Sequence, residues 1–162
     1  MKKKKSNFNR RKIDKDKIAD YDYHLPVLLN ECIENLINIR SGVYIDGTLG
    51  GGGHAARVLE SLTEGGILLA FDKDPNAIAH CERKYHSYLN GSGSGQLRLY
   101  NDCYSKAPEI ALEYGNVNGL LLDLGVSSRQ LDSESRGVSY RVDSPLDMRF
   151  GTKGMSAEDL LN

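Results

Sequence analysis

The feature that most constrains the fold is a short apolar run at residues 43–54 that ends on an aspartate and continues into glycines (VYIDGTLGGGGH). Glycines directly after a strand let the backbone turn tightly and leave room for a ligand against main-chain N–H groups at the next helix N-terminus. Gly50, Gly52 and Ala55 also fit the spacing G-x-G-x-x-A, which is a weak signal until a strand and a helix flank it. The alternative is a flexible glycine loop in any α/β protein. Both flanks are plausible here, so the stretch predicts a nucleotide-type site.

The hydrophobic pattern on both sides of this loop predicts alternating strands and helices. The continuous apolar run at residues 43–46 is typical of a parallel strand that is covered on both faces, and further strands are expected over residues 67–72, 96–100 and 117–123. Helices are expected from Pro26 to about residue 37, over residues 55–62, from Pro75 to about residue 88, and over about residues 106–114. The chain is therefore predicted to be α/β, with a parallel sheet and helices on both faces.

Three of the predicted strands end on an acid, at Asp46, Asp72 and Asp123. Asp72 follows the glycine loop by about twenty residues, which places it to accept both hydroxyls of an adenosine ribose; a structural turn acid is the alternative. Asp74 is expected to cap the helix that follows. Tyr104, after the third strand, is placed to stack on an adenine ring or to pack in the core.

The three strand-tip acids discriminate between two cofactors that bind folds of this kind. They would repel the pyrophosphate of a dinucleotide, whereas they would attract the sulfonium and ammonium groups of S-adenosylmethionine. The sequence also offers no candidate residue for a hydride-transfer site. The acid pattern therefore favours the methyl donor over a nicotinamide cofactor.

Composition limits the remaining classes of protein. The chain has 162 residues, 40% of them hydrophobic, and we expect one globular domain that is not a membrane protein. Cys32, Cys81 and Cys103 are odd in number and never in C-x-x-C spacing, so neither a disulfide framework nor a zinc site is predicted. No metal is expected. This cysteine usage suggests a reducing compartment, the cytoplasm, or a mitochondrion or plastid if the source is eukaryotic.

The formal net charge of −1 conceals a basic arm. Seven of the 21 Lys and Arg residues lie in residues 1–12, which leaves 14 basic against 22 acidic residues in the rest of the chain. Such an arm can hold a polyanion through phosphate contacts, or it can be a solvated disordered tail. We divide the chain into this arm at residues 1–22 and a domain at residues 23–162.

Several motifs together closely resemble one family, the S-adenosylmethionine-dependent ribosomal RNA small-subunit (cytosine-N4)-methyltransferases (MraW/RsmH). The resemblance covers nearly everything after Tyr21 and implies a Rossmann-like class I methyltransferase fold. It is carried by HLPVLL at residues 24–29, DGT at 46–48, GGGH at 51–54, DKDP at 72–75, DLGVSSRQLD at 123–132 and PLDMR at 145–149. Departures from the family pattern are small, such as Tyr104 where the family usually has Phe, and they leave the implied cofactor unchanged.

The resemblance implies which residues bind the cofactor and what the enzyme does. The cofactor contacts that it implies are Gly52, Gly53, His54, Asp72, Tyr104, Asp123 and Gln130, to which we add Asp46 and Gly51. The implied substrate is a cytidine of small-subunit ribosomal RNA, which is unstacked into the site. Asp123 is the candidate catalytic acceptor for the reacting amine. His24, Asp143, Asp147 and Arg149 are expected to bind the RNA, although ion pairs within the loop are an equal alternative for the last three.

Length is the main departure from this family, whose members run to about twice this length. We therefore expect an incomplete domain, truncated after its fourth strand, in which residues 117–124 form an edge that promotes self-association. The sequence does not fix the oligomeric state. A cofactor-binding but inactive fragment or interaction module is the alternative function, and an NAD-dependent oxidoreductase is less favoured.

Overall fold

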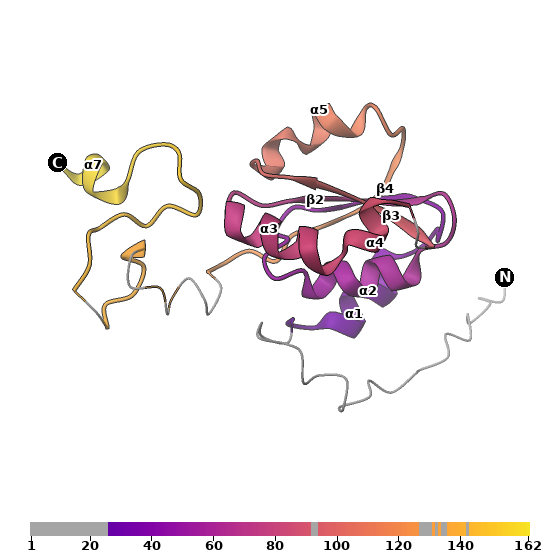
Figure 1. Cartoon of the computed structure of the whole chain (residues 1–162), viewed down its shortest axis with the longest axis horizontal. Helices are drawn as coiled ribbons and strands as arrows, with labels where there is room; N and C mark the ends of the chain where they lie inside the picture. The colour runs from indigo at the N-terminus through magenta and orange to yellow at the C-terminus, as the bar shows by residue number, and fades with distance from the viewer. Residues whose placement is uncertain (1–25, 92–93, 127–130, 132, 134–135, 142) are drawn as a thin grey trace, which may run out of the picture.

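The computed structural model describes residues 26–91, 94–126, 131, 133, 136–141 and 143–162. Its centre is a four-stranded parallel sheet of order β3-β2-β1-β4, with helices on both faces (Figure 1). The predicted Rossmann-like α/β fold is therefore confirmed. The strands are β1 (Val43–Asp46), β2 (Gly66–Phe71), β3 (Gly95–Tyr100) and β4 (Val117–Leu121). The helices are α1 (Leu29–Leu36), α2 (Gly53–Ser61), α3 (Pro75–Lys84), α4 (His86–Leu89), η2 (Tyr104–Lys106), α5 (Ala107–Ala111) and α7 (Ala157–Leu161).

The two faces of the sheet bury two separate apolar clusters, because successive side chains of a strand point to opposite faces. Tyr44 and Leu68 belong to the larger cluster, which includes residues of α1, α2 and α3. Ile45 and Leu69 belong to the smaller one, which is closed by Ala107 and other residues of α5. Figure 1 shows α5 on one side of the sheet and α1 to α4 on the other. Both faces of β1 and β2 are thus covered, which explains their unbroken apolar sequences.

The first helix begins later than predicted. The expectation that Pro26 starts it was wrong: α1 starts at Leu29, after Leu28 adopts a left-handed φ of 51°. The ring of Pro26 instead lies against Gly53, where any Cβ would overlap the Pro26 ring. The segment before α1 is therefore used to cover the glycine loop rather than to extend the helix.

The helices after β2 and β3 are also shorter than predicted. A single helix from Pro75 to about residue 88 was expected, but α3 ends at Lys84, and Tyr85, with φ −113°, separates it from α4. The helix expected over residues 106–114 is the 3₁₀ turn η2 followed by α5, which ends at Ala111. The break at Tyr85 matters for the site, because it accompanies a contact of this side chain with the glycine loop.

The described residues after β4 lie outside the sheet, and the last of them form α7. Figure 1 shows this segment to one side of the α/β body. It returns to the body at the turn between β2 and α3, where Arg136 pairs with Asp74 and a Cβ on Gly151 would lie 2.7 Å from the Lys73 carbonyl oxygen. Among the described residues, the helices are all too short or too polar to cross a membrane.

Candidate functional site

The glycine loop after β1 is hydrogen-bonded to the carboxyl edge of the sheet. The Gly47 amide donates to the carbonyl of Leu121 at 3.0 Å, and the Leu49 amide donates to that of Phe71, also at 3.0 Å. The loop thus bridges the ends of the two strands that flank β1. It brings the three predicted strand-tip acids to the same edge, as expected where the ends of parallel strands meet.

Asp46 is buried beneath this loop. Only 1% of the residue is exposed, and its Oδ1 accepts a hydrogen bond from the Thr48 amide at 3.0 Å. Burial, with smaller contributions from the nearby charges of Asp72 and Asp123, raises the pKa of Asp46 to about 7, although the hydrogen bonds with Thr48 oppose the rise. Asp46 therefore anchors the loop from below, and its predicted contact with a cofactor stays a prediction.

Asp72 sits at the end of β2 with both carboxylate oxygens engaged by backbone donors. Oδ2 accepts from the Gly50 amide at 2.7 Å, and Oδ1 accepts from the Asp74 amide at 2.8 Å. Burial raises the pKa of Asp72, and these two hydrogen bonds oppose the rise. Since each carboxylate oxygen can accept more than one hydrogen bond, the half-buried side chain retains acceptor capacity for ligand hydroxyls.

Helix α3 and the residue that follows it, Tyr85, support the glycine loop, which sequence reasoning missed. Tyr85 donates its buried hydroxyl to the Gly52 carbonyl at 2.8 Å, and the Cys81 thiol lies 3.5 Å from the Gly50 carbonyl oxygen. Gly52 has a left-handed φ of 76°, and a Cβ there would lie 2.6 Å from the Tyr85 ring. The only sequence signal was the i, i+4 spacing of Cys81 and Tyr85, which puts them on one helix face.

His54, at the start of α2, lies between Val27, which precedes α1, and Asp123, which follows β4. Its Nε2 lies 3.2 Å from the Val27 carbonyl oxygen, and its Nδ1 lies 3.9 Å from Oδ2 of Asp123. The Asp123 amide donates to the Thr48 hydroxyl at 2.7 Å. The strand predicted to run to Asp123 ends at Leu121, because beyond that residue the chain bonds to the glycine loop instead of to β1. The Asp123 side chain is 51% exposed and therefore open to a ligand.

The remaining cofactor candidates are Tyr104, two glycines of the loop and Gln130. Tyr104 begins η2 beside Gly47 and is 40% exposed, so its ring is available for stacking. Gly51 is buried within the loop, and Gly53 contacts Pro26. Gln130 and His24 lie outside the described residues.

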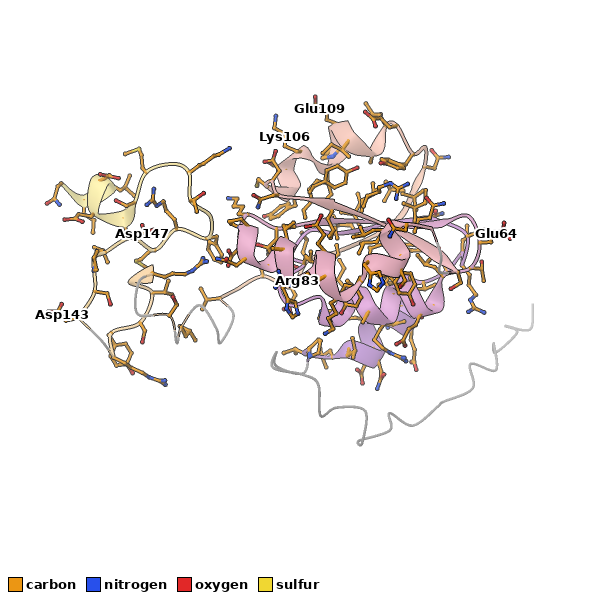
Figure 2. All side chains as sticks on the ribbon, viewed as in Figure 1. Glu64, Arg83, Lys106, Glu109, Asp143 and Asp147 are labelled. Atoms are coloured by element: carbon orange, nitrogen blue, oxygen red, sulfur yellow. The ribbon has the colours of Figure 1, made fainter. Side chains whose placement is uncertain are left out.

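The three candidate RNA-binding residues lie on the loop before α7, where Figure 2 labels Asp143 and Asp147. Arg149 donates from Nε and Nη2 to Asp147, at 2.9 and 2.6 Å, and from Nη1 to the Gly154 carbonyl at 3.0 Å. These hydrogen bonds from Arg149 lower the pKa of Asp147 to about 2. The pair of Arg149 and Asp147 is thus the ion pair within the loop that was the alternative, and the exposed Asp143 lies earlier in the loop. Binding of RNA by these residues stays a prediction.

Candidate metal ligands are not grouped in the described ranges. Among those residues, no three His, Cys, Asp or Glu side chains come together in an arrangement that could hold a metal ion. The described cysteines, Cys32, Cys81 and Cys103, are free thiols.

This architecture defines a class: a Rossmann-like domain with a glycine loop after the first strand and an acid after the second, which is typical of nucleoside-cofactor binding. Residues 22–162 match the MraW methylase family, and the chain belongs to it, as the sequence motifs predicted. Curated relatives called ribosomal RNA small subunit methyltransferase H include one from Zymomonas mobilis, 44% identical over 141 residues. Others are from Alteromonas mediterranea, 45% over 143 residues, and Fusobacterium nucleatum, 40% over 144 residues.

The match extends over most of this chain but under half of each relative. It covers 86% of the chain and 40% of the Zymomonas protein, 85% and 43% for Alteromonas, and 87% and 44% for Fusobacterium. The site described above therefore belongs to the part of the relatives' sequence that this chain shares.

Proposed function

We propose that this chain forms the cofactor-binding part of an S-adenosylmethionine-dependent methyltransferase that modifies N4 of a cytidine in small-subunit ribosomal RNA. Membership of the MraW methylase family and the names of the relatives support the reaction class and the RNA substrate. The observation that carries the choice of cofactor is the convergence of Asp46, Asp72 and Asp123 on one glycine loop. A negative edge of this kind suits a cationic sulfonium cofactor better than a pyrophosphate.

The residues present fit such a cofactor. Asp72 would accept the two ribose hydroxyls, because both of its oxygens keep acceptor capacity while backbone amides hold the carboxylate in place. Tyr104 would stack on the adenine, and the loop from Gly51 to His54 would lie against the methionine part. S-adenosylmethionine would supply the reactive methyl group.

Asp123 is the candidate for promoting attack by the substrate amine. The exocyclic amine of cytosine is a poor nucleophile, because its lone pair is delocalised into the ring. A carboxylate that accepts a hydrogen bond from one N–H group of this amine favours rehybridisation of the nitrogen. It also stabilises the positive charge that develops on the nitrogen during attack. Asp123 is exposed enough to be reached, and the Thr48 hydroxyl fixes its backbone. Holding the two reactants in line adds a proximity effect of up to about 7–11 kcal/mol.

The first test is calorimetry of the purified chain with S-adenosylmethionine and, separately, with NAD. We expect binding of the first and not of the second. Asp72→Ala should weaken the affinity by about 1–3 kcal/mol, through loss of charge-assisted hydrogen bonds. Glu64→Ala is the matched control, since Figure 2 shows Glu64 at the opposite end of the α/β body from Asp147. Equal binding of NAD, or an unchanged affinity in Asp72→Ala, would contradict the proposal.

The reaction itself is tested with the complete protein. Transfer of labelled methyl to small-subunit ribosomal RNA, with the modified nucleotide identified by mass spectrometry, should give N4-methylcytidine. Binding of S-adenosylmethionine without methyl transfer by the complete protein would instead support the alternative, a cofactor-binding but inactive interaction module.

A further inference from the structure

One ion pair joins the turn beside the proposed cofactor site to the segment that carries the proposed RNA-binding residues. Nη2 of Arg136 lies 2.7 Å from Oδ2 of Asp74, and the side chains are only 21% and 15% exposed. Asp74 is two residues beyond the ribose-binding candidate Asp72, whereas Arg136 lies in the segment after β4 that carries Asp147 and Arg149. A shielded pair of this kind is screened less than a surface pair and holds its partners more firmly.

Arg136 also organises the segment to which it belongs. Its Nη1 donates to the Phe150 carbonyl at 2.9 Å, and its own carbonyl accepts from the Met148 amide, also at 2.9 Å. These bonds close the segment into a loop, with described residues 136–141 and 143–150, whose two ends meet at one arginine. Gly151, directly after it, packs against Lys73 between Asp72 and Asp74. The whole loop is thus fastened to the turn between β2 and α3.

Asp74 has two separable tasks at that turn. Its Oδ1 accepts from the Asn76 amide at 3.0 Å and caps α3, while its Oδ2 holds Arg136. Its amide in turn donates to Asp72. An unbroken chain of hydrogen bonds therefore runs from the ribose-binding carboxylate through Asp74 to the closure of the loop. The Arg136 charge also favours ionisation of Asp72, against the effect of burial on its pKa.

We propose that Arg136 is a positioning residue that couples cofactor binding to the ordering of the RNA-binding loop. The inference rests on the proposed function and extends it. A cofactor whose ribose binds Asp72 stabilises the turn at residues 72–75, and the Arg136–Asp74 pair passes this order to the loop that carries Asp147 and Arg149. By linkage, a substrate that orders the loop tightens cofactor binding by the same factor.

The test uses hydrogen exchange, read by mass spectrometry, on peptides from residues 136–151 of this chain with and without saturating S-adenosylmethionine. In the wild type, the cofactor should slow exchange in the glycine loop and also in this segment. In Arg136→Gln the glycine loop should still respond and the segment should not. Asp74→Ser should behave in the same way, because serine keeps a capping oxygen for α3 but cannot pair with arginine.

Two further variants separate coupling from simple loss of stability. Glu109→Gln removes the surface ion pair between Glu109 of α5 and Lys106 of η2, and should leave the cofactor response of the segment intact. Arg136→Lys keeps the charge and should restore part of the response. In the complete protein, Arg136→Gln should raise KM for RNA about fivefold or more, the usual scale of such coupling, with a smaller change in kcat.

The outcomes are distinct. If the wild type binds S-adenosylmethionine but exchange in residues 136–151 does not respond, or if Arg136→Gln retains the response, the coupling is refuted while the proposed function stands. A segment that exchanges faster in Arg136→Gln by the same factor with and without cofactor assigns Arg136 a purely structural role and also refutes it. Failure of the wild type to bind S-adenosylmethionine refutes the proposed function, and the coupling with it.

Discussion

Asp46→Asn should make the protein more stable at neutral pH and less sensitive to pH. The substitution keeps the shape of the side chain and an oxygen that accepts from the Thr48 amide, but it removes the charge. The folded-state pKa of Asp46 is about 7, against an ordinary value of 3.8. At 1.36 kcal/mol per pKa unit, ionising this buried group costs the folded state about 4 kcal/mol.

The sign of the effect follows from linkage. Below pH 4, Asp46 is protonated in both the folded and the unfolded states, and the wild type has its full stability. Between about pH 4 and pH 7 the unfolded chain releases this proton while the folded protein keeps it, so the free energy of unfolding falls as the pH rises. Above pH 7 the loss is complete, and the asparagine variant does not suffer it.

The assay is urea denaturation of the wild type and of Asp46→Asn from pH 4 to pH 8. The variant's advantage should grow from near zero at pH 4 to about 4 kcal/mol at pH 8. Asp147→Asn is the control of opposite sign, because the pKa of Asp147 is lowered to about 2. For this control the pH series is extended down to about 2, and the wild type should gain stability relative to the variant as the pH rises from about 2 to about 4. A flat difference for Asp46→Asn, or a variant less stable at pH 8, would refute the account of this buried carboxylate.

Three other predictions concern the loop and the thiols. Tyr85→Phe should weaken S-adenosylmethionine binding by about 1 kcal/mol in calorimetry, because the Gly52 carbonyl keeps the Ala56 amide but loses its second donor. Tyr44→Phe, which also removes a buried hydroxyl, should lower stability without changing that affinity, and equal affinities of the two variants would contradict the prediction. With iodoacetamide at pH 8, mass spectrometry should find Cys103 labelled well before Cys81, because burial raises the pKa of Cys81 to about 12, whereas a hydrogen bond with the neighbouring serine lowers that of Cys103. Methylation by the complete enzyme should survive zinc chelation with magnesium in excess, and strict zinc dependence would show that the cysteines were misinterpreted.

The sheet was predictable because the hydrophobic pattern that indicates each strand lies within the strand's own residues. A parallel strand covered on both faces must be apolar at every position, so β1 and β2 stand out as unbroken runs bounded by glycines and acids. The order β3-β2-β1-β4 follows from the pairing of β1 with both β2 and β4 and of β2 with β3. Asp74 as the cap of α3 was predictable too, since an aspartate before a proline is a local signal.

The errors arose where a distant contact overrides a local preference. Pro26 fits the first turn of a helix, but its ring is needed against Gly53, and the helix starts three residues later. Leu122 and Asp123 continue an apolar run ending in an acid, yet the Asp123 amide bonds to Thr48 instead of extending β4. The roles of Tyr85 and Arg136 depend on partners 33 and 62 residues away. The hydrophobic periodicity of a sequence does not indicate contacts between residues so far apart in the chain.

The hydrogen bond between Gly50 and Asp72 gives the choice of cofactor a second physical basis, besides the sign of the charge. In a dinucleotide site, loop amides and the following helix N-terminus point at the pyrophosphate. Here the Gly50 amide donates to Asp72 at 2.7 Å, so a phosphate would have to displace a carboxylate from that donor. A cofactor that presents hydroxyls to Asp72 leaves this bond in place. Asp72→Asn, which keeps an acceptor but loses the charge, should therefore weaken S-adenosylmethionine binding without creating affinity for NAD. Tight NAD binding by this variant would show that charge alone excludes the dinucleotide.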